Sequence, residues 1–186
     1  MNTERELHVR SAALLILPPP MHIRAEACSD ELAIDRLLDS AFARRSHTDH
    51  AEAAIVRALR ADGDLTLSLV AESGGDVVAH VAFSPVLIDD AEGPWFGLGP
   101  LAVQPQHQRQ GIGTTLARQG LTKLRLSGAA GCVVLGDPNF YGRLGFVCDE
   151  RLHYKDLPTR FIQRIVFHGA VPSGEIVYAR AFDLAE

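Results

Sequence analysis

The sequence contains no long hydrophobic run and no run of basic residues. Its longest apolar stretch, residues 12–17, ends at three consecutive prolines, whereas a helix needs roughly 20 apolar residues to cross a bilayer. Lys and Arg together number 18 against 23 Asp and Glu, which gives a net charge of −5. General nucleic-acid binding depends on neutralising phosphates, so this balance argues against it. We therefore expect neither a membrane nor a nucleic acid as a partner.

Cysteine is also scarce. The three cysteines, Cys28, Cys132 and Cys148, cannot all pair with one another and have no Cys-x-x-Cys spacing. Such thiols are typical of a reduced, cytoplasmic protein and do not indicate a disulfide framework or a zinc site. His47 and His50 have the spacing of two metal ligands, but no third ligand is evident. We predict surface histidines there and no bound metal.

The remaining composition is that of a globular protein. Of the 186 residues, 47% are apolar and 22% are charged, close to the ordinary mix and far from that of a disordered chain. Residues 1–27 resemble a signal peptide only faintly, because Glu4 and Glu6 interrupt its basic region and three prolines interrupt its apolar region. We interpret residues 1–20 as an N-terminal extension and residues 21–186 as one domain.

Hydrophobic periodicity predicts how this domain is built. Apolar residues recur at helical spacing after Ser29 and Asp30, and Asp49 starts a capping-box pattern with Glu52. The order β-α-α-β-β-β-α-β-α-β-β indicates an α/β (α+β mixed) fold, with a mixed central sheet of about six to seven strands flanked by about four helices. The predicted strands span residues 21–27, 65–69, 77–88, 95–103, 132–135, 161–167 and 176–182, and the helices span residues 32–42, 49–63, 116–128 and 137–143.

One segment has the pattern of an anion site. The strand ending at Val103 is followed by a polar loop, residues 104–113, that enters a helix through Gly111 and Gly113. The N-terminus of a helix presents backbone N–H groups, and the helix dipole favours negative charge there. Glycine lets a phosphate approach the backbone without a Cβ in the way. The segment therefore predicts a phosphate site, most simply for a pyrophosphate.

Three classes of nucleotide site share this pattern, and two of them fit poorly. A P-loop requires a lysine after the second glycine, but Thr114 and Thr115 follow here. A dinucleotide fold requires a third glycine where this chain has Leu116. The third class is the coenzyme A loop.

The run Gln108-x-x-Gly111-x-Gly113 resembles the coenzyme A signature of the GNAT superfamily, the Gcn5-related N-acetyltransferases. The segment Tyr141–Phe146 resembles that superfamily's Tyr-x-x-x-Gly-Phe element, and the order of elements matches its fold from about Met21 to Phe182. The segments 98–103 and 135–141 look like those of a bacterial subgroup of predicted acetyltransferases, the YhbS-like proteins.

The resemblance implies a site for acetyl-CoA. In such enzymes the strand matching Leu101–Val103 splays from the strand matching Cys132–Leu135, and the pantetheine arm fills the gap. The Val103 amide would polarise the thioester carbonyl, and Tyr141 would protonate the departing thiolate as a general acid. The residues implied to bind the cofactor are Leu101, Ala102, Val103, Gln108, Arg109, Gln110, Gly111, Ile112, Gly113, Thr114 and Asn139.

Two features depart from the family pattern. Many members carry a carboxylate on the strand before the loop, but residues 94–103 contain none. We expect His80 to act as the base, because its ordinary pKa suits proton transfer near neutrality; a buried structural histidine is the alternative, and further candidates follow in the next turn. Members of the superfamily often carry an Asn seven residues before the tyrosine, where this chain has Val134. Asn139 would take the place of that Asn from a different position. The further candidates for the base are Asp89, Asp90 and Glu92.

The resemblance predicts a cytoplasmic N-acetyltransferase that moves an acetyl group from acetyl-CoA to a primary amine by direct attack in a ternary complex. The acceptor, a small molecule or a peptide, is not indicated by any motif. The missing strand carboxylate leaves an alternative open, a non-catalytic module that binds coenzyme A as a sensor or partner. The sequence also leaves a homodimer open.

Overall fold

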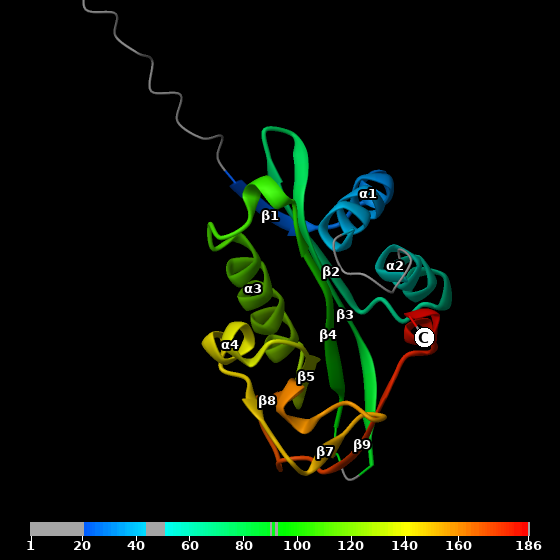
Figure 1. The fold of residues 1–186 in the computed structure, drawn as a ribbon, viewed down its shortest axis with the longest axis vertical. Helices are drawn as coiled ribbons and strands as arrows, with labels where there is room; N and C mark the ends of the chain where they lie inside the picture. Colours follow the sequence, from blue (N-terminus) through cyan, green and yellow to red (C-terminus); the bar gives the residue numbers. More distant parts are fainter. Residues whose placement is uncertain (1–20, 44–50, 90, 92, 186) are drawn as a thin grey trace, which may run out of the picture.

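The computed structural model describes residues 21–43, 51–89, 91 and 93–185. A long central sheet has helices α1 and α2 on one side and α3 and α4 on the other (Figure 1). The helices are α1 (Glu31–Phe42), α2 (Ala51–Asp62), α3 (Ile112–Leu126) and α4 (Pro138–Tyr141). The strands are β1 (Met21–Ala25), β2 (Leu67–Ser73), β3 (Asp76–Ile88), β4 (Trp95–Val103), β5 (Gly131–Leu135), β6 (Val147–Cys148), β7 (Leu152–His153), β8 (Ile162–Val166) and β9 (Gly174–Tyr178).

The mixed α/β fold predicted from the sequence is confirmed, with differences in the last third of the chain. The sheet has nine strands among the described residues, because β6 and β7 are only two residues long and leave no periodic pattern. The strand expected over residues 176–182 ends at Tyr178, and a 3-10 helix, η5 (Arg180–Ala185), follows it. The expected extension at residues 1–20, the pair His47 and His50, and the capping Asp49 lie outside the described residues.

The sheet is antiparallel except at two places. Its strand order is β1-β2-β3-β4-β5-β8-β6, and β9 pairs with the end of β3. Strands β4 and β5 are parallel, as are the short β7 and β9. None of the helices in the described ranges is long and apolar enough to cross a membrane.

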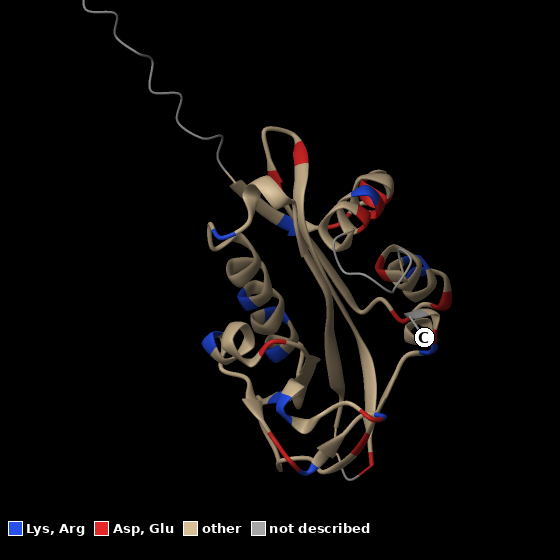
Figure 2. Cartoon of the chain, viewed as in Figure 1, with Lys and Arg blue, Asp and Glu red and all other residues tan. Residues whose placement is uncertain are grey.

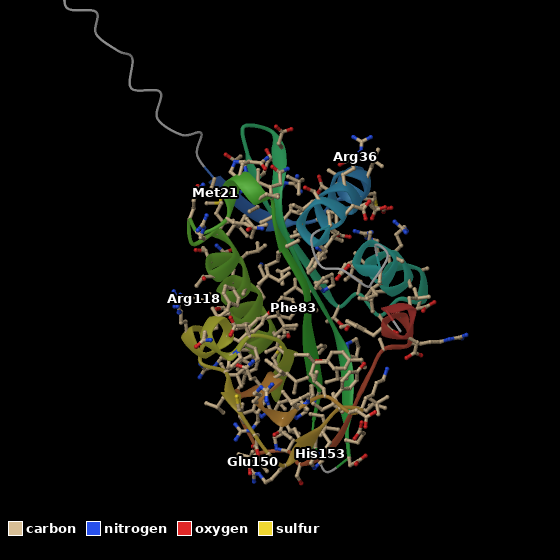
Figure 3. All side chains as sticks on the ribbon, viewed as in Figure 1. Met21, Arg36, Phe83, Arg118, Glu150 and His153 are labelled. Carbon is tan, nitrogen blue, oxygen red and sulfur yellow. The ribbon has the colours of Figure 1, made fainter. Side chains whose placement is uncertain are left out.

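Strand β3 lies at the centre of the core and is buried over most of its length. Toward α3 it presents Val81 and Phe83, which pack in one apolar cluster with the buried face of that helix. Toward α1 and α2 it presents Ala82, which packs with Ile34 and Val56. Side chains fill the space between the sheet and α3 around Phe83 (Figure 3). Because both faces of the sheet are buried at β3, the helices on either side pack against this strand.

Gly120 sets how closely α3 approaches the sheet. A Cβ at this position would lie 2.3 Å from Cε2 of Phe83. Glycine is unfavourable inside a helix by about 1 kcal/mol relative to alanine, so its presence here reflects the close contact with the ring.

We therefore predict that Gly120→Ala lowers the free energy of unfolding by about 1–3 kcal/mol, because the added methyl group overpacks the core. Urea unfolding followed by circular dichroism measures this. The matched control is Gly142→Ala, where φ is −57° and no atom lies within 4 Å of the added Cβ. An unchanged midpoint for Gly120→Ala would contradict the packing described here.

Candidate active site

The site is formed where two neighbouring strands separate. Strands β4 and β5 pair only from Trp95 to Gly97 on β4. Beyond Gly97, β3 is the one partner of β4 within residues 21–43, 51–89, 91 and 93–185, and the register there shifts: Val81 faces Leu101 but Phe83 faces Leu98. Two residues of β4 thus oppose one of β3, which is a β-bulge, and a bulge bends the strand that carries it. The bend is consistent with the fork that opens between β4 and β5.

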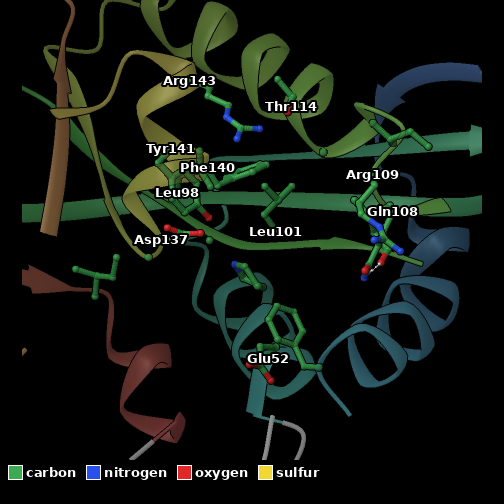
Figure 4. A pocket seen from close by; sticks show the side chains of 18 of the residues that line it. Glu52, Leu98, Leu101, Gln108, Arg109, Thr114, Asp137, Phe140, Tyr141 and Arg143 are labelled. Atoms are coloured by element: carbon green, nitrogen blue, oxygen red, sulfur yellow. Dashed lines mark hydrogen bonds between the residues drawn. The ribbon is translucent and has the colours of Figure 1, made fainter. Parts of the chain in front are cut away.

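A cavity of about 920 Å³ occupies this fork. Strand β4 contributes the bulge and the residues after it, and the other lining residues come from both sides of the sheet. In Figure 4, Thr114, Phe140 and Tyr141 lie on one side of Leu101 and Glu52 lies on the other. The cavity therefore meets both helical layers, so a donor and an acceptor could approach from different sides.

One wall of the cavity is the loop and the helix end predicted from the sequence. Gly111, which precedes α3, has a φ of +82°, and Arg109 has a φ of +60°. Gln108 Nε2 donates to the Val103 carbonyl at 3.1 Å and so ties the loop to β4. The predicted residues that line the cavity are Leu101, Val103, Gln108, Arg109, Gly111, Ile112, Gly113 and Thr114. The wall combines a helix N-terminus with the cations of Arg109 and Arg143, which favours an anion.

Tyr141 also lines the cavity, at the end of α4. Its ring packs edge-on against Phe146, with centroids 5.8 Å apart. A Cβ at Gly136 would lie 2.6 Å from Cε2 of Tyr141, so only glycine there leaves room for the ring. Asp137 caps α4 by accepting the Asn139 N–H at 2.9 Å. These contacts hold the Tyr141 ring in place beside the cavity.

Three of the predicted binding residues do not line the cavity. Ala102 is buried on the opposite face of β4, against the cluster of α1 and α2. The Gln110 side chain donates to the Gln106 carbonyl at 3.1 Å. The Asn139 side chain donates to Asp137 at 3.0 Å. These three residues form no part of the cavity wall, so their contact with the cofactor stays a prediction.

The interpretation of His80 as the base is corrected by its position. His80 is fully buried and does not line the cavity. Its Nε2 lies 2.8 Å from Oγ of Ser68 and 3.6 Å from the Glu26 carboxylate. Burial lowers the pKa of His80, and the nearby carboxylate of Glu26 offsets this only in part. A fully buried ring that does not line the cavity cannot contact a substrate bound there.

Of the other candidates for the base, the structure describes only Asp89. Asp89 accepts a hydrogen bond from the Glu175 N–H at 2.9 Å and does not line the cavity. Asp90 and Glu92 lie outside the described residues.

His80 belongs to a polar cluster that joins the first strand region to α2. Glu26 accepts from Ser68 and from Arg60, whose Nε is 2.8 Å away. Burial alone would raise the pKa of Glu26, but the contacts with His80, Arg60 and Ser68 outweigh it and lower the pKa to about 2. The Glu26 carboxylate thus stays ionised in the folded protein and pairs with Arg60.

For several lining residues the sequence predicted no part in the site. They come from α1, α2, β9 and η5, so only the fold brings them together: Phe42, Glu52, Ile55, Tyr178 and Phe182. The Tyr178 ring packs on Gly97, where a Cβ would lie 2.4 Å from Cε1. The Tyr178 hydroxyl is buried and has no hydrogen-bond partner among the described residues. Burial raises the pKa of Tyr178 well above its ordinary value, so the hydroxyl keeps its proton.

Comparison with known proteins agrees with this geometry. Residues 32–146 match the model of the acetyltransferase (GNAT) family. An uncharacterised N-acetyltransferase of Escherichia coli K12, YhbS, is 45% identical over 142 residues, which are 76% of this chain and 80% of the relative.

Two solved structures are similar to this one. A GNAT family acetyltransferase from Brucella melitensis, crystallised with acetyl-CoA, is 44% identical, with a TM-score of 0.78; the match covers 88% of this chain and 99% of that one. YhbS of Escherichia coli, crystallised with CoA, is 35% identical, with a TM-score of 0.80; the match covers 89% and 93% of the two chains.

We predict that Glu26→Gln destabilises the protein by about 2 kcal/mol at neutral pH, because Arg60 loses its charged partner. A lowered pKa makes the contribution of Glu26 present above the ordinary value of 4.5 and lost as the pH falls toward about 2. The difference between wild type and variant should therefore shrink over that range in urea unfolding. Glu150→Gln, at an exposed carboxylate, is the control and should differ from wild type at no pH. A difference for Glu26→Gln that stays constant through acid would contradict this account.

Proposed function

The chain belongs to the acetyltransferase (GNAT) family of acetyl-CoA-dependent acyltransferases, and on this premise we propose that it transfers the acetyl group directly to the primary amine of an acceptor in a ternary complex. One observation carries the proposal: a cavity extends through the fork between β4 and β5, with an anion-binding wall on one side and a separate wall on the other. Donor and acceptor can then occupy the two sides at once.

The donor occupies the side of α3. Its pyrophosphate is held by the N–H groups of residues 109–114, at the helix N-terminus, with the cations of Arg109 and Arg143 beside it. Helix α3 carries three basic residues and no acidic one, which Figure 2 shows as blue segments on this side, and such a surface attracts an anionic cofactor. Relatives from Brucella melitensis and Escherichia coli were crystallised with acetyl-CoA and CoA, which supports this choice of donor.

The pantetheine arm lies in the fork, alongside β4. Beyond Gly97 the outer edge of β4 has no strand partner in the part of the chain that the structure describes, and the amide groups of the arm can pair with this edge as another strand would. The thioester then reaches the bulge end of this edge, close to Leu98 and Tyr141, where a backbone N–H of the unpaired edge can donate to the carbonyl oxygen of the acetyl group. This contact stabilises the negative charge that develops on the oxygen during attack. Val103 packs against Gly113 of the loop and therefore lies at the pyrophosphate end of the arm.

The transfer needs no covalent enzyme intermediate. The acceptor loses one proton to solvent, and the neutral amine attacks the thioester carbon to form a C–N bond. The C–S bond then breaks, the Tyr141 hydroxyl gives its proton to the thiolate, and the N–H proton of the attacking amine returns to Tyr141 through water. The products are the amide and free coenzyme A, and Tyr141 ends in its original state.

The catalytic reading is favoured over a non-catalytic coenzyme A module. Tyr141 lies in the same cavity as the loop, and the cavity continues past it to residues of α1, α2 and β9. A module that only bound the cofactor would not need this second side.

We place the protein in the cytoplasm, because its three cysteines are free, and two of them, Cys28 and Cys148, are exposed.

We predict that Gly111→Asp abolishes binding of acetyl-CoA in calorimetry. The variant adds a negative charge beside the phosphates and a side chain where φ is +82°. Gly128→Asp is the matched control, since Gly128 has a φ of +88°, equally open surroundings and no place in the cavity. It should bind acetyl-CoA as wild type does. Equal loss in both variants would mean that backbone strain, and not the charge at the loop, removes binding.

We predict that Tyr141→Phe lowers kcat by about 100-fold or more, the usual contribution of a general acid, and leaves the Kd for acetyl-CoA within about twofold of wild type. Release of free thiol in the presence of an amine measures the first, and calorimetry the second. Tyr154→Phe, which removes a hydroxyl outside the cavity, is the control. A Tyr141→Phe enzyme with normal kcat would remove the acid role.

A further inference from the structure

The wall opposite the donor loop identifies the class of acceptor. We propose that the acceptor carries a second positive charge besides its reacting amine, that Glu52 binds this charge, and that an apolar spacer joins the two groups. The simplest such molecule is an alkyl diamine. This inference rests on the proposed function and adds the acceptor to it.

Glu52 is suited to a cation from outside the protein. Only Glu52 and Asp137 place carboxylates in the cavity among the described residues. Asp137 is occupied in capping α4, where it accepts two hydrogen bonds from Asn139. Glu52 forms no hydrogen bond or ion pair with the described part of the chain, and its side chain is partly buried in the cavity wall. A carboxylate so placed favours a positively charged ligand.

The surroundings of Glu52 suit an alkyl spacer. Phe42, Ile55, Tyr178 and Phe182 complete this part of the wall. The rings of Tyr178 and Phe182 are stacked at an angle, with centroids 4.9 Å apart, and Phe182 packs on the cluster that includes Ile55. Aromatic faces attract cations, and apolar walls exclude water, which strengthens the attraction between Glu52 and an ammonium group.

The charge at Glu52 must be a second one and not the reacting amine. A carboxylate next to an amine favours its protonated form, whereas attack on the thioester requires the neutral amine. Figure 4 also shows Glu52 across Leu101 from Tyr141, where the thioester lies in the proposed reaction. The reacting amine therefore lies on the Tyr141 side of Leu101, away from the Glu52 carboxylate.

The test compares diamines with monoamines of equal length. Wild-type enzyme is assayed for thiol release from acetyl-CoA with putrescine against n-butylamine, cadaverine against n-pentylamine, and hexamethylenediamine against n-hexylamine. We expect kcat/KM to favour the diamine by about tenfold or more for the length that spans the site. In Glu52→Gln this ratio should fall to about one, through a higher KM for the diamine with kcat nearly unchanged. The ratio compares substrates on one enzyme sample, so partial misfolding does not alter it.

The matched control is Asp62→Asn, which removes one negative charge from the exposed far end of the same helix. It should keep the wild-type ratio. A Glu52→Gln enzyme that still prefers the diamine, or a wild-type enzyme that prefers no diamine or acetylates none of these amines, would overturn the inference. Calorimetry with acetyl-CoA separates this from a failure of the proposed function: wild type that binds acetyl-CoA keeps the donor site, whereas wild type that does not bind it loses both.

Discussion

The active site depends on the point where β4 and β5 stop pairing. The two parallel strands share only three residue pairs, and beyond Gly97 the edge of β4 faces a cavity in place of a strand. The bulge at Gly99 and Pro100 bends β4 at this point, and Pro100 has no N–H to donate to a ladder. An unpaired edge inside a folded protein is normally unfavourable. A ligand with its own amide groups, such as the pantetheine arm we propose here, removes that cost when it binds.

The rigidity of the fork comes from the layers on both sides of β3. Phe83 packs against α3 with no room for a side chain at Gly120, and Ala82 packs against α1 and α2. The polar cluster of Glu26, Arg60, Ser68 and His80 adds hydrogen bonds between the first strand region, β2, β3 and α2. A charged cluster at such a depth is tolerated because its charges are paired. Its role is to hold α2 in place, and α2 in turn carries Glu52 to the cavity.

The two walls of the cavity differ in charge. Arg109, Arg143 and the N-terminus of α3 form a positive wall, and Glu52 lies on the opposite side. Coenzyme A is an anion, and amines are cations at neutral pH, so in the reaction we propose each wall attracts one substrate and repels the other. On that proposal, this separation lets one continuous cavity hold two substrates at distinct sites.

Local sequence patterns determined most of the helices and strands of this protein and the position of its anion-binding loop. The periodicity of α1 and α3, the mostly apolar runs of β3 and β4, and the glycines at 111 and 113 are short-range features, because a helix start or a strand depends on neighbouring residues. The loop and Tyr141 were therefore predictable, and both line the cavity. The role of His80 was not, because burial depends on what packs over a strand, and no local signal reports it. Glu52 and Tyr178 lie more than a hundred residues apart in the sequence. The pairing of β9 with β3 and the contact of α2 with η5 bring them to one wall of the cavity. Contacts between such distant segments form only when the whole chain folds, so they leave no local pattern in the sequence.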